Sequence, residues 1–170
     1  MTSAPVTSGR AVAHHLLTLK VENRAGVLVR IAGLFSRRGF NIVSLAVAPT
    51  DNDRFSRVSI VVDVESAPLQ QILDQLSKLV NVVEILELAP EDATERELLL
   101  ATVNFAQPTR DYLLVLVEAA GADLVDERGD VATVMLAGHP DELDAFASAL
   151  MRTGIIELQR TGSIALPKLD

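Results

Sequence analysis

The chain contains 170 residues, of which 49% are hydrophobic and none is cysteine, and its formal net charge at pH 7 is -8. That hydrophobic fraction supplies a packed core and excludes wholesale disorder, and the length allows one large domain or two small ones. The negative charge argues against nucleic-acid binding, and the absence of cysteine excludes disulfides and cysteine–zinc sites. No apolar run is long enough to span a bilayer. Residues 1–13 are rich in polar and small residues, so we expect a disordered arm in a cytoplasmic protein without a membrane partner.

The first half of the chain alternates between strand-like and helix-like patterns. Alternating apolar residues predict strands, whereas Val27, Ile31 and Leu34 recur at helical spacing behind a turn at 23–26. The expected order is strand 16–21, helix 27–38, strand 41–48, a turn at 49–53, a strand that includes 58–64, a helix from Pro68 to Leu79, and strand 82–88. This β-α-β-β-α-β order is the ferredoxin-like split βαβ unit.

The second half repeats this element order after a polar break. Residues 90–94 predict a linker between a first domain at 14–89 and a second domain at 95–170. The expected elements are strand 98–105, helix 108–120, a hairpin of strands 122–127 and 131–137, a helix from Pro140 that ends at Gly154, and strand 155–161. Residues 113–117 alone also fit a strand, and the tail from Gly162 has no assigned element. We therefore expect an α+β protein with two ferredoxin-like βαββαβ domains in tandem.

The most informative feature is the pair of asparagines around the first helix. Asn23 and Gly26 form an Asn-x-x-Gly turn that opens the helix, and Asn41 starts the strand that follows it. A helix N-terminus offers backbone N–H groups and a positive dipole to a small anion such as an amino-acid carboxylate. We expect both asparagines to lie at one edge of the sheet, and in a twofold dimer two such edges can face each other. The alternative is that these are ordinary turn residues.

Other polar residues give weaker signals. The chain has three histidines, His14, His15 and His139, and their spacing does not fit a metal site. No serine lies near a histidine that could act as its base. The turn at 51–53 lacks the glycine and the closing glutamate of a calcium loop. The first helix carries a basic patch, which is either a solvated face or a docking surface for an acidic partner: Arg30, Arg37 and Arg38.

The same stretch identifies a family. Residues 23–31, 33–42, 44–45 and 47–50 closely resemble the regulatory (small) subunit of acetolactate synthase, also called acetohydroxyacid synthase. Shorter matches occur at 76–80, 95–98 and 136–138, so the resemblance spans about 16–164. It implies an N-terminal ACT domain that binds an amino-acid effector, a C-terminal ACT-like domain and a homodimer.

The resemblance also implies a partner and an activity. The partner is the large catalytic subunit, which carries thiamine diphosphate, magnesium and FAD and condenses two pyruvates, or pyruvate and 2-oxobutyrate, in branched-chain amino-acid biosynthesis. The small subunit has no cofactor and no catalytic residue of its own; it raises the activity of its partner and confers feedback inhibition, typically by valine. The residues that match effector-binding positions are Asn23, Gly26, Val27, Leu28, Asn41 and Ile42.

The residue chemistry agrees with a branched aliphatic effector. Backbone N–H groups near Gly26 provide donors for a carboxylate, the asparagine amides provide donors and acceptors, and Val27, Leu28 and Ile42 provide an apolar wall. One methylene changes binding by only about 1–3 kcal/mol, so discrimination between valine, leucine and isoleucine should be incomplete. Two alternatives stay open. One is a free-standing ACT-domain sensor that regulates another enzyme or a transcription factor, and the other is an acylphosphatase-like hydrolase that uses Arg24 and Asn23.

Overall fold

The computed structural model describes residues 13–64 and 66–169. Within these residues the N-terminal domain consists of β1 (Ala13–Glu22), α1 (Val27–Arg37), β2 (Ile42–Pro49), β3 (Phe55–Val64), α2 (Ser66–Leu76) and β4 (Val82–Leu88). Every element predicted for this half is present and in the predicted order. The expected arm at 1–13 lies outside the described residues except for Ala13, which begins β1.

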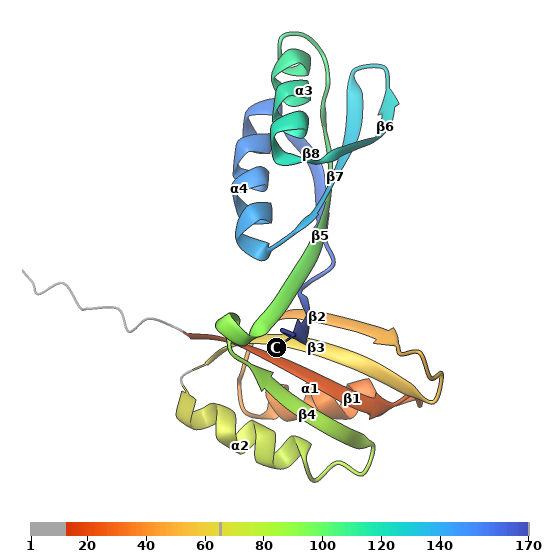
Figure 1. The fold of residues 1–170 in the computed structure, drawn as a ribbon, viewed down its shortest axis with the longest axis vertical. Helices are drawn as coiled ribbons and strands as arrows, with labels where there is room; N and C mark the ends of the chain where they lie inside the picture. Colours follow the sequence, from red (N-terminus) through yellow and green to blue (C-terminus); the bar gives the residue numbers. More distant parts are fainter. Residues whose placement is uncertain (1–12, 65, 170) are drawn as a thin grey trace, which may run out of the picture.

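The four strands of this domain form one antiparallel sheet in the order β2-β3-β1-β4. Helices α1 and α2 cover one face of the sheet (Figure 1). Alternate residues of β1 point to that face, because successive side chains of a strand lie on opposite sides. They form the core with residues from both helices and from β3: Leu17, Leu19, Val21, Val27, Ile31, Leu34, Phe35, Val58, Ile60, Val62, Leu69, Ile72 and Leu76.

The C-terminal domain repeats this architecture. It consists of β5 (Ala93–Asn104), α3 (Thr109–Ala120), β6 (Asp123–Arg128), β7 (Val131–Gly138), α4 (Pro140–Leu150) and β8 (Ile155–Arg160). The strand order β6-β7-β5-β8 corresponds to that of the first domain. The segment that also fitted a strand lies in α3, where Leu113 and Val117 are buried one helical turn apart. A short 3-10 turn, η2 (Met151–Thr153), follows α4, so Gly154 ends this turn and not the helix itself.

The junction between the domains has regular structure. The predicted linker at 90–94 contains a 3-10 turn, η1 (Pro90–Asp92), and the first two residues of β5. A further strand, β9 (Ile164–Pro167), lies in the tail where the sequence pattern predicts no element. It pairs antiparallel with the first part of β5, from Ala93 to Arg96. Strand β5 therefore extends continuously from the junction into the C-terminal sheet.

A small apolar cluster joins the two domains. It contains Leu16 and Leu88 from the N-terminal sheet, Ala93 from β5 and Ala165 from β9. Leu16 lies on the opposite side of β1 from the core residues Leu17 and Leu19, so the cluster lies on the face of the N-terminal sheet opposite α1 and α2. The C-terminal domain stands above that face (Figure 1). Each of the four side chains is less than 10% exposed, so the junction is a packed contact.

Candidate functional site

The turn that follows β1 is held in place by the loop between β2 and β3. The Asn23 backbone N–H donates to the Arg54 carbonyl oxygen (2.8 Å), and the Asn23 side-chain Nδ2 donates to the Asp53 carbonyl oxygen (3.0 Å). Among the described residues, the Oδ1 atom of Asn23 has no hydrogen-bond partner. Asn23 therefore has a fixed amide whose acceptor oxygen remains open.

Helix α1 begins without a side-chain cap. Gly26 is its N-cap residue, with φ 85° and ψ -9°, and the first turn of the helix contains no acidic residue. The Val27 N–H donates to the Arg24 carbonyl (3.4 Å), whereas in the described part of the chain the N–H groups of Leu28 and Val29 have no partner. Unpaired N–H groups and the helix dipole make this end favourable for an anion.

The backbone conformation at position 26 favours glycine. Its positive φ lies in the left-handed region, which residues other than glycine adopt at a cost. A Cβ atom added there would meet no atom within 4 Å, so the space in front of Gly26 is open in the single chain. This free space beside the backbone leaves room for a ligand to approach the turn closely, which stays a prediction.

The apolar residues at this turn differ in their surroundings. The side chain of Val27 is only 5% exposed and belongs to the core, whereas Leu28 is 40% exposed. Because Val27 packs into the core, Leu28 is the residue of this pair that can form the expected apolar wall. Ile42 is half-buried and packs against the same core.

The structure corrects the expected placement of the two asparagines. Glu22, the residue before Asn23, pairs with Phe55, whereas Ile42, the residue after Asn41, pairs with Val62. Phe55 and Val62 are seven residues apart on β3, which corresponds to about 23 Å along the strand. The prediction that one edge of the sheet carries both asparagines is therefore wrong, because β1 and β2 both run antiparallel to β3 and so run in the same direction.

Three of the other polar residues that the sequence singles out have structural partners. His139 caps α4, because its Nδ1 accepts the Asp141 N–H, and the Oδ1 of Asn52 in the turn at 51–53 accepts the Arg54 N–H (3.1 Å). Arg30 donates to Asn81 Oδ1 (3.2 Å). Within residues 13–64 and 66–169, no group of three histidine, aspartate or glutamate residues is arranged to hold a metal ion, and no helix is long and apolar enough to cross a membrane.

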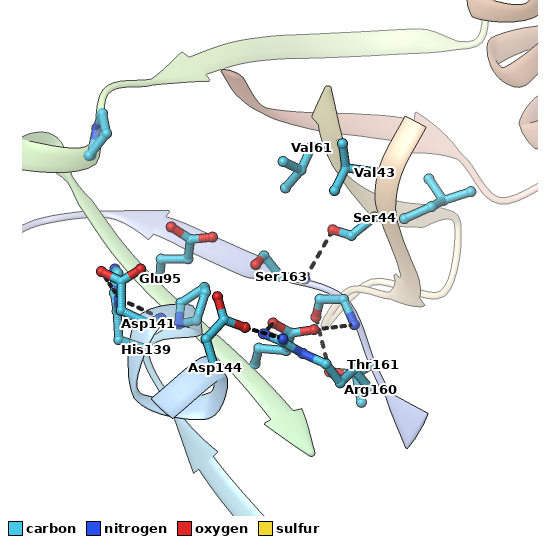
Figure 2. A pocket seen from close by; sticks show the side chains of 15 residues that line it. Val43, Ser44, Val61, Glu95, His139, Asp141, Asp144, Arg160, Thr161 and Ser163 are labelled. Carbon is cyan, nitrogen blue, oxygen red and sulfur yellow. Dashed lines mark hydrogen bonds and ion pairs between the residues drawn. The ribbon is translucent and has the colours of Figure 1, made fainter. Parts of the chain in front are cut away.

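A cavity of about 820 Å³ lies between the two domains. Figure 2 shows Val43, Ser44 and Val61 of the N-terminal sheet on one side, and Asp144, Arg160 and Ser163 on the other. The sequence pattern does not predict this cavity, because its walls come from separate segments spread along the chain from Val43 to Ser163. The one visible signal is Glu97, an acidic residue at a buried position of the alternating strand β5.

Comparison with known proteins gives matches along nearly the whole chain. Residues 17–84 match the model of the AHAS small subunit-like ACT domain, and residues 96–169 match the model of the small subunit of acetolactate synthase. The chain is 40% identical over 154 residues to the acetolactate synthase small subunit of Mycolicibacterium smegmatis, which covers 91% of each chain. This chain belongs to the acetolactate synthase small subunit family.

Further relatives support the same family across distant organisms. The probable acetolactate synthase small subunit of Archaeoglobus fulgidus is 39% identical, over 89% of this chain and 95% of its own. The crystal structure of the acetolactate synthase small subunit from Thermotoga maritima superposes with a TM-score of 0.86 at 32% identity, covering 94% of this chain and 99% of that chain. The resemblance that rests on residues 23–50 is therefore confirmed, and so is the tandem fold.

Within this small-subunit chain, the two domains differ at the helix start that follows the first strand. At the start of α3, which corresponds to α1, the first turn contains Asp111, which accepts a hydrogen bond from Gln107 Nε2 (3.0 Å). The start of α4 has a complete capping box, in which Glu142 accepts the His139 N–H (2.8 Å). Both helices of the C-terminal domain, α3 and α4, therefore have an acidic side chain of the chain itself in their first turn. The first turn of α1, by contrast, contains no acidic residue.

Proposed function

We propose that this chain binds a branched-chain amino acid, with valine preferred, and so regulates the large catalytic subunit of acetolactate synthase. The observation that carries the proposal is the start of α1, where Gly26 opens the helix without a cap and the Leu28 and Val29 N–H groups have no partner in the described residues. The effector carboxylate binds at these N–H groups. The effector ammonium donates to Asn23 Oδ1.

Two copies of the chain are needed to complete the site. Asn41 and Ile42 lie at the opposite end of the sheet from Asn23, so one copy supplies residues 23–28 and the other supplies 41–42. A twofold homodimer forms two equal sites of this kind. The side chains of Leu28 and Ile42 then contact the aliphatic part of the effector from two sides.

The proposed activity is regulatory. The small subunit raises the turnover of the catalytic subunit and confers inhibition by valine, whereas thiamine diphosphate, magnesium and FAD belong to the catalytic subunit. The chain by itself therefore makes no acetolactate. Two observations support this proposal. The relatives of this chain are named as small subunits of acetolactate synthase, and residues 23–50 resemble that family.

Calorimetric titration of the purified chain tests the ligand. Valine is compared with leucine and isoleucine, and with two analogues that each lack one charged group: 2-oxoisovalerate has no ammonium, and isobutylamine has no carboxylate. We expect valine to bind, leucine and isoleucine to bind within about 200-fold of it, and both analogues to bind far more weakly. Equal binding of isobutylamine and valine would contradict the role of the α1 N–H groups.

Reconstitution with the catalytic subunit tests the regulatory role. We expect pyruvate turnover by the complex to exceed that of the catalytic subunit alone and to fall when valine is added. The small subunit alone, supplied with thiamine diphosphate and magnesium, should show no turnover. Turnover by the isolated chain, or a complex that is no more active than the catalytic subunit alone, would refute the proposal.

A further inference from the structure

The connection between β8 and β9 presses against the N-terminal sheet. We name residues 161–163 the docking loop. The Ser163 N–H donates to Ser44 Oγ of β2 (3.2 Å), and a Cβ atom added to Gly162 would lie 3.1 Å from Ser44 Cβ (Figure 2). Gly162 also has a φ of 80°. Only glycine combines this conformation with such close contact, so the docking loop is fitted to β2 at Ser44.

A buried carboxylate holds the docking loop from the other side. Glu97 Oε1 accepts the Gly162 N–H (3.1 Å), and Glu97 Oε2 accepts from Arg160 Nη2 (2.5 Å). The Glu97 side chain is only 7% exposed, so its charge depends on these donors. Hydrogen bonding to Glu97 raises the pKa of Arg160 above its ordinary value, so the guanidinium stays charged.

The same arginine reaches α4. Arg160 Nη1 donates to Asp144 of α4 in addition to the Glu97 contact (Figure 2). Polar contacts therefore run without a break from Ser44 on β2, through the docking loop, to Glu97, Arg160 and α4. These contacts and the apolar cluster around Leu16 and Ala165 are separate connections between the domains. The polar connection depends on the positions of its donors and acceptors, because a hydrogen bond is lost when either of the two groups moves away.

Strand β2 has an irregularity at the point where these contacts begin. Ile42 pairs with Val62 but Ser44 pairs with Val61, so the register shifts between Ile42 and Ser44. Such a bulge bends a strand and changes the direction in which the next side chain points. Asn41 and Ile42, which belong to the proposed effector site, immediately precede this bulge, and Ser44 immediately follows it.

We propose that the docking loop couples the effector site to the C-terminal domain, with Ser44 as its contact on β2 and Glu97 as the positioning residue behind it. This inference rests on the proposed function, since the effector is what acts on β2. An effector at Asn41 and Ile42 changes the bulge and the direction of Ser44. The docking loop follows Ser44, and the change reaches α4 through Glu97 and Arg160.

Hydrogen exchange of the free full-length chain tests the loop without any effector. Glu97→Gln removes the charge that holds Arg160 and Gly162, so the amides of Gly162 and Ser163 should both exchange faster. Ser44→Ala should speed exchange at Ser163 alone. Glu95→Gln is the matched control, because Glu95 lies on the same strand and the same cavity wall. Unchanged exchange in Glu97→Gln would overturn the positioning role.

The reconstituted complex tests the coupling. We expect Glu97→Gln and Ser44→Ala to bind valine within twofold of the wild type by calorimetry, and to need at least about fivefold more valine for half-inhibition. Glu95→Gln should match the wild type in both measurements. If valine inhibits the wild-type complex and both variants give the same inhibition curve as the wild type, the inference is overturned. If the wild-type chain binds no valine, the proposed function is refuted instead. The claim that an effector acts through the docking loop is then refuted as well.

Discussion

Asn23 and Asn41 lie at opposite ends of one four-stranded sheet. Asn23 follows the residue that pairs with Phe55 at the start of β3, and Asn41 precedes the residue that pairs with Val62 near its end. Because Phe55 and Val62 are about 23 Å apart along β3, Asn23 and Asn41 cannot both contact a single amino acid within one chain. If both contribute to effector binding, each site combines two copies.

Replacement of Asn23 by alanine should weaken valine binding and leave the fold intact. The substitution removes the open Oδ1 acceptor and the bond from Nδ2 to the Asp53 carbonyl. A hydrogen bond to a charged group contributes about 1.5–3 kcal/mol, so we expect the Kd for valine to rise about 10- to 150-fold. Calorimetry gives the Kd, and circular dichroism checks the fold. The control is Asn104→Ala, which changes an exposed asparagine of the C-terminal domain. If Asn23→Ala bound valine with the same Kd as this control, the proposed site would be contradicted.

Replacement of Gly26 by aspartate should produce a complex that valine no longer inhibits but that still responds to its small subunit. Aspartate places a carboxylate next to the α1 N–H groups, where it repels the carboxylate of the effector and competes for its donors. Because Gly26 has a positive φ, strain contributes as well. The measurement is valine inhibition of the reconstituted complex.

Gly26→Asn separates charge from strain in this experiment. Asparagine tolerates the left-handed conformation about as well as aspartate and carries no charge. We expect Gly26→Asn to retain most of its valine sensitivity, whereas Gly26→Asp loses it. Equal loss in both variants would show that backbone strain, and not the added charge, determines the effect.

Valine should stabilise the dimer of the small subunit. An effector that binds across an interface favours association by mass action, by about 2.7 kcal/mol per site at a hundredfold excess over its Kd. Sedimentation velocity at low protein concentration, with and without valine, measures the dimer dissociation constant. A dissociation constant that does not change with valine would contradict a shared site, and the Asn23→Ala chain should show little change at the same valine concentration.

Much of the fold follows from local sequence patterns. Strand β4 has the predicted bounds, 82–88, and α1 differs from its prediction by one residue, because alternation and helical periodicity act within each segment. Strand β9 has only four residues and exists through its pairing with Ala93–Arg96, which lies about 70 residues away. No local pattern predicts such a strand. The same pairing places residues 93–94 of the predicted linker in strand β5.

The sequence indicates candidate residues for the site but does not indicate how they are placed relative to one another. The Asn-x-x-Gly turn before an amphipathic helix is visible in the sequence, and the structure shows the uncapped helix start there. The misplacement of Asn41 arose because the chain direction of β2 depends on its pairing with β3 and not on its own residues. Glu97 was missed for a similar reason, since its buried charge is compensated by Arg160, 63 residues later.

Mixed dimers test the central claim most directly, that each effector site is shared between two copies. One chain carries Asn23→Ala and the other carries Asn41→Ala, and two different affinity tags allow the mixed dimer to be purified. In a shared arrangement, one of its two sites receives both substitutions, and the other receives wild-type Asn23 from one copy and wild-type Asn41 from its partner. In an arrangement within one chain, each site carries one substitution.

Calorimetric titration of the mixed dimer with valine distinguishes these arrangements. We predict one site per dimer with the wild-type Kd, half the number found in the wild-type dimer, although either variant alone binds weakly at both sites. A mixed dimer in which no site recovers the wild-type Kd would contradict a site shared between two copies.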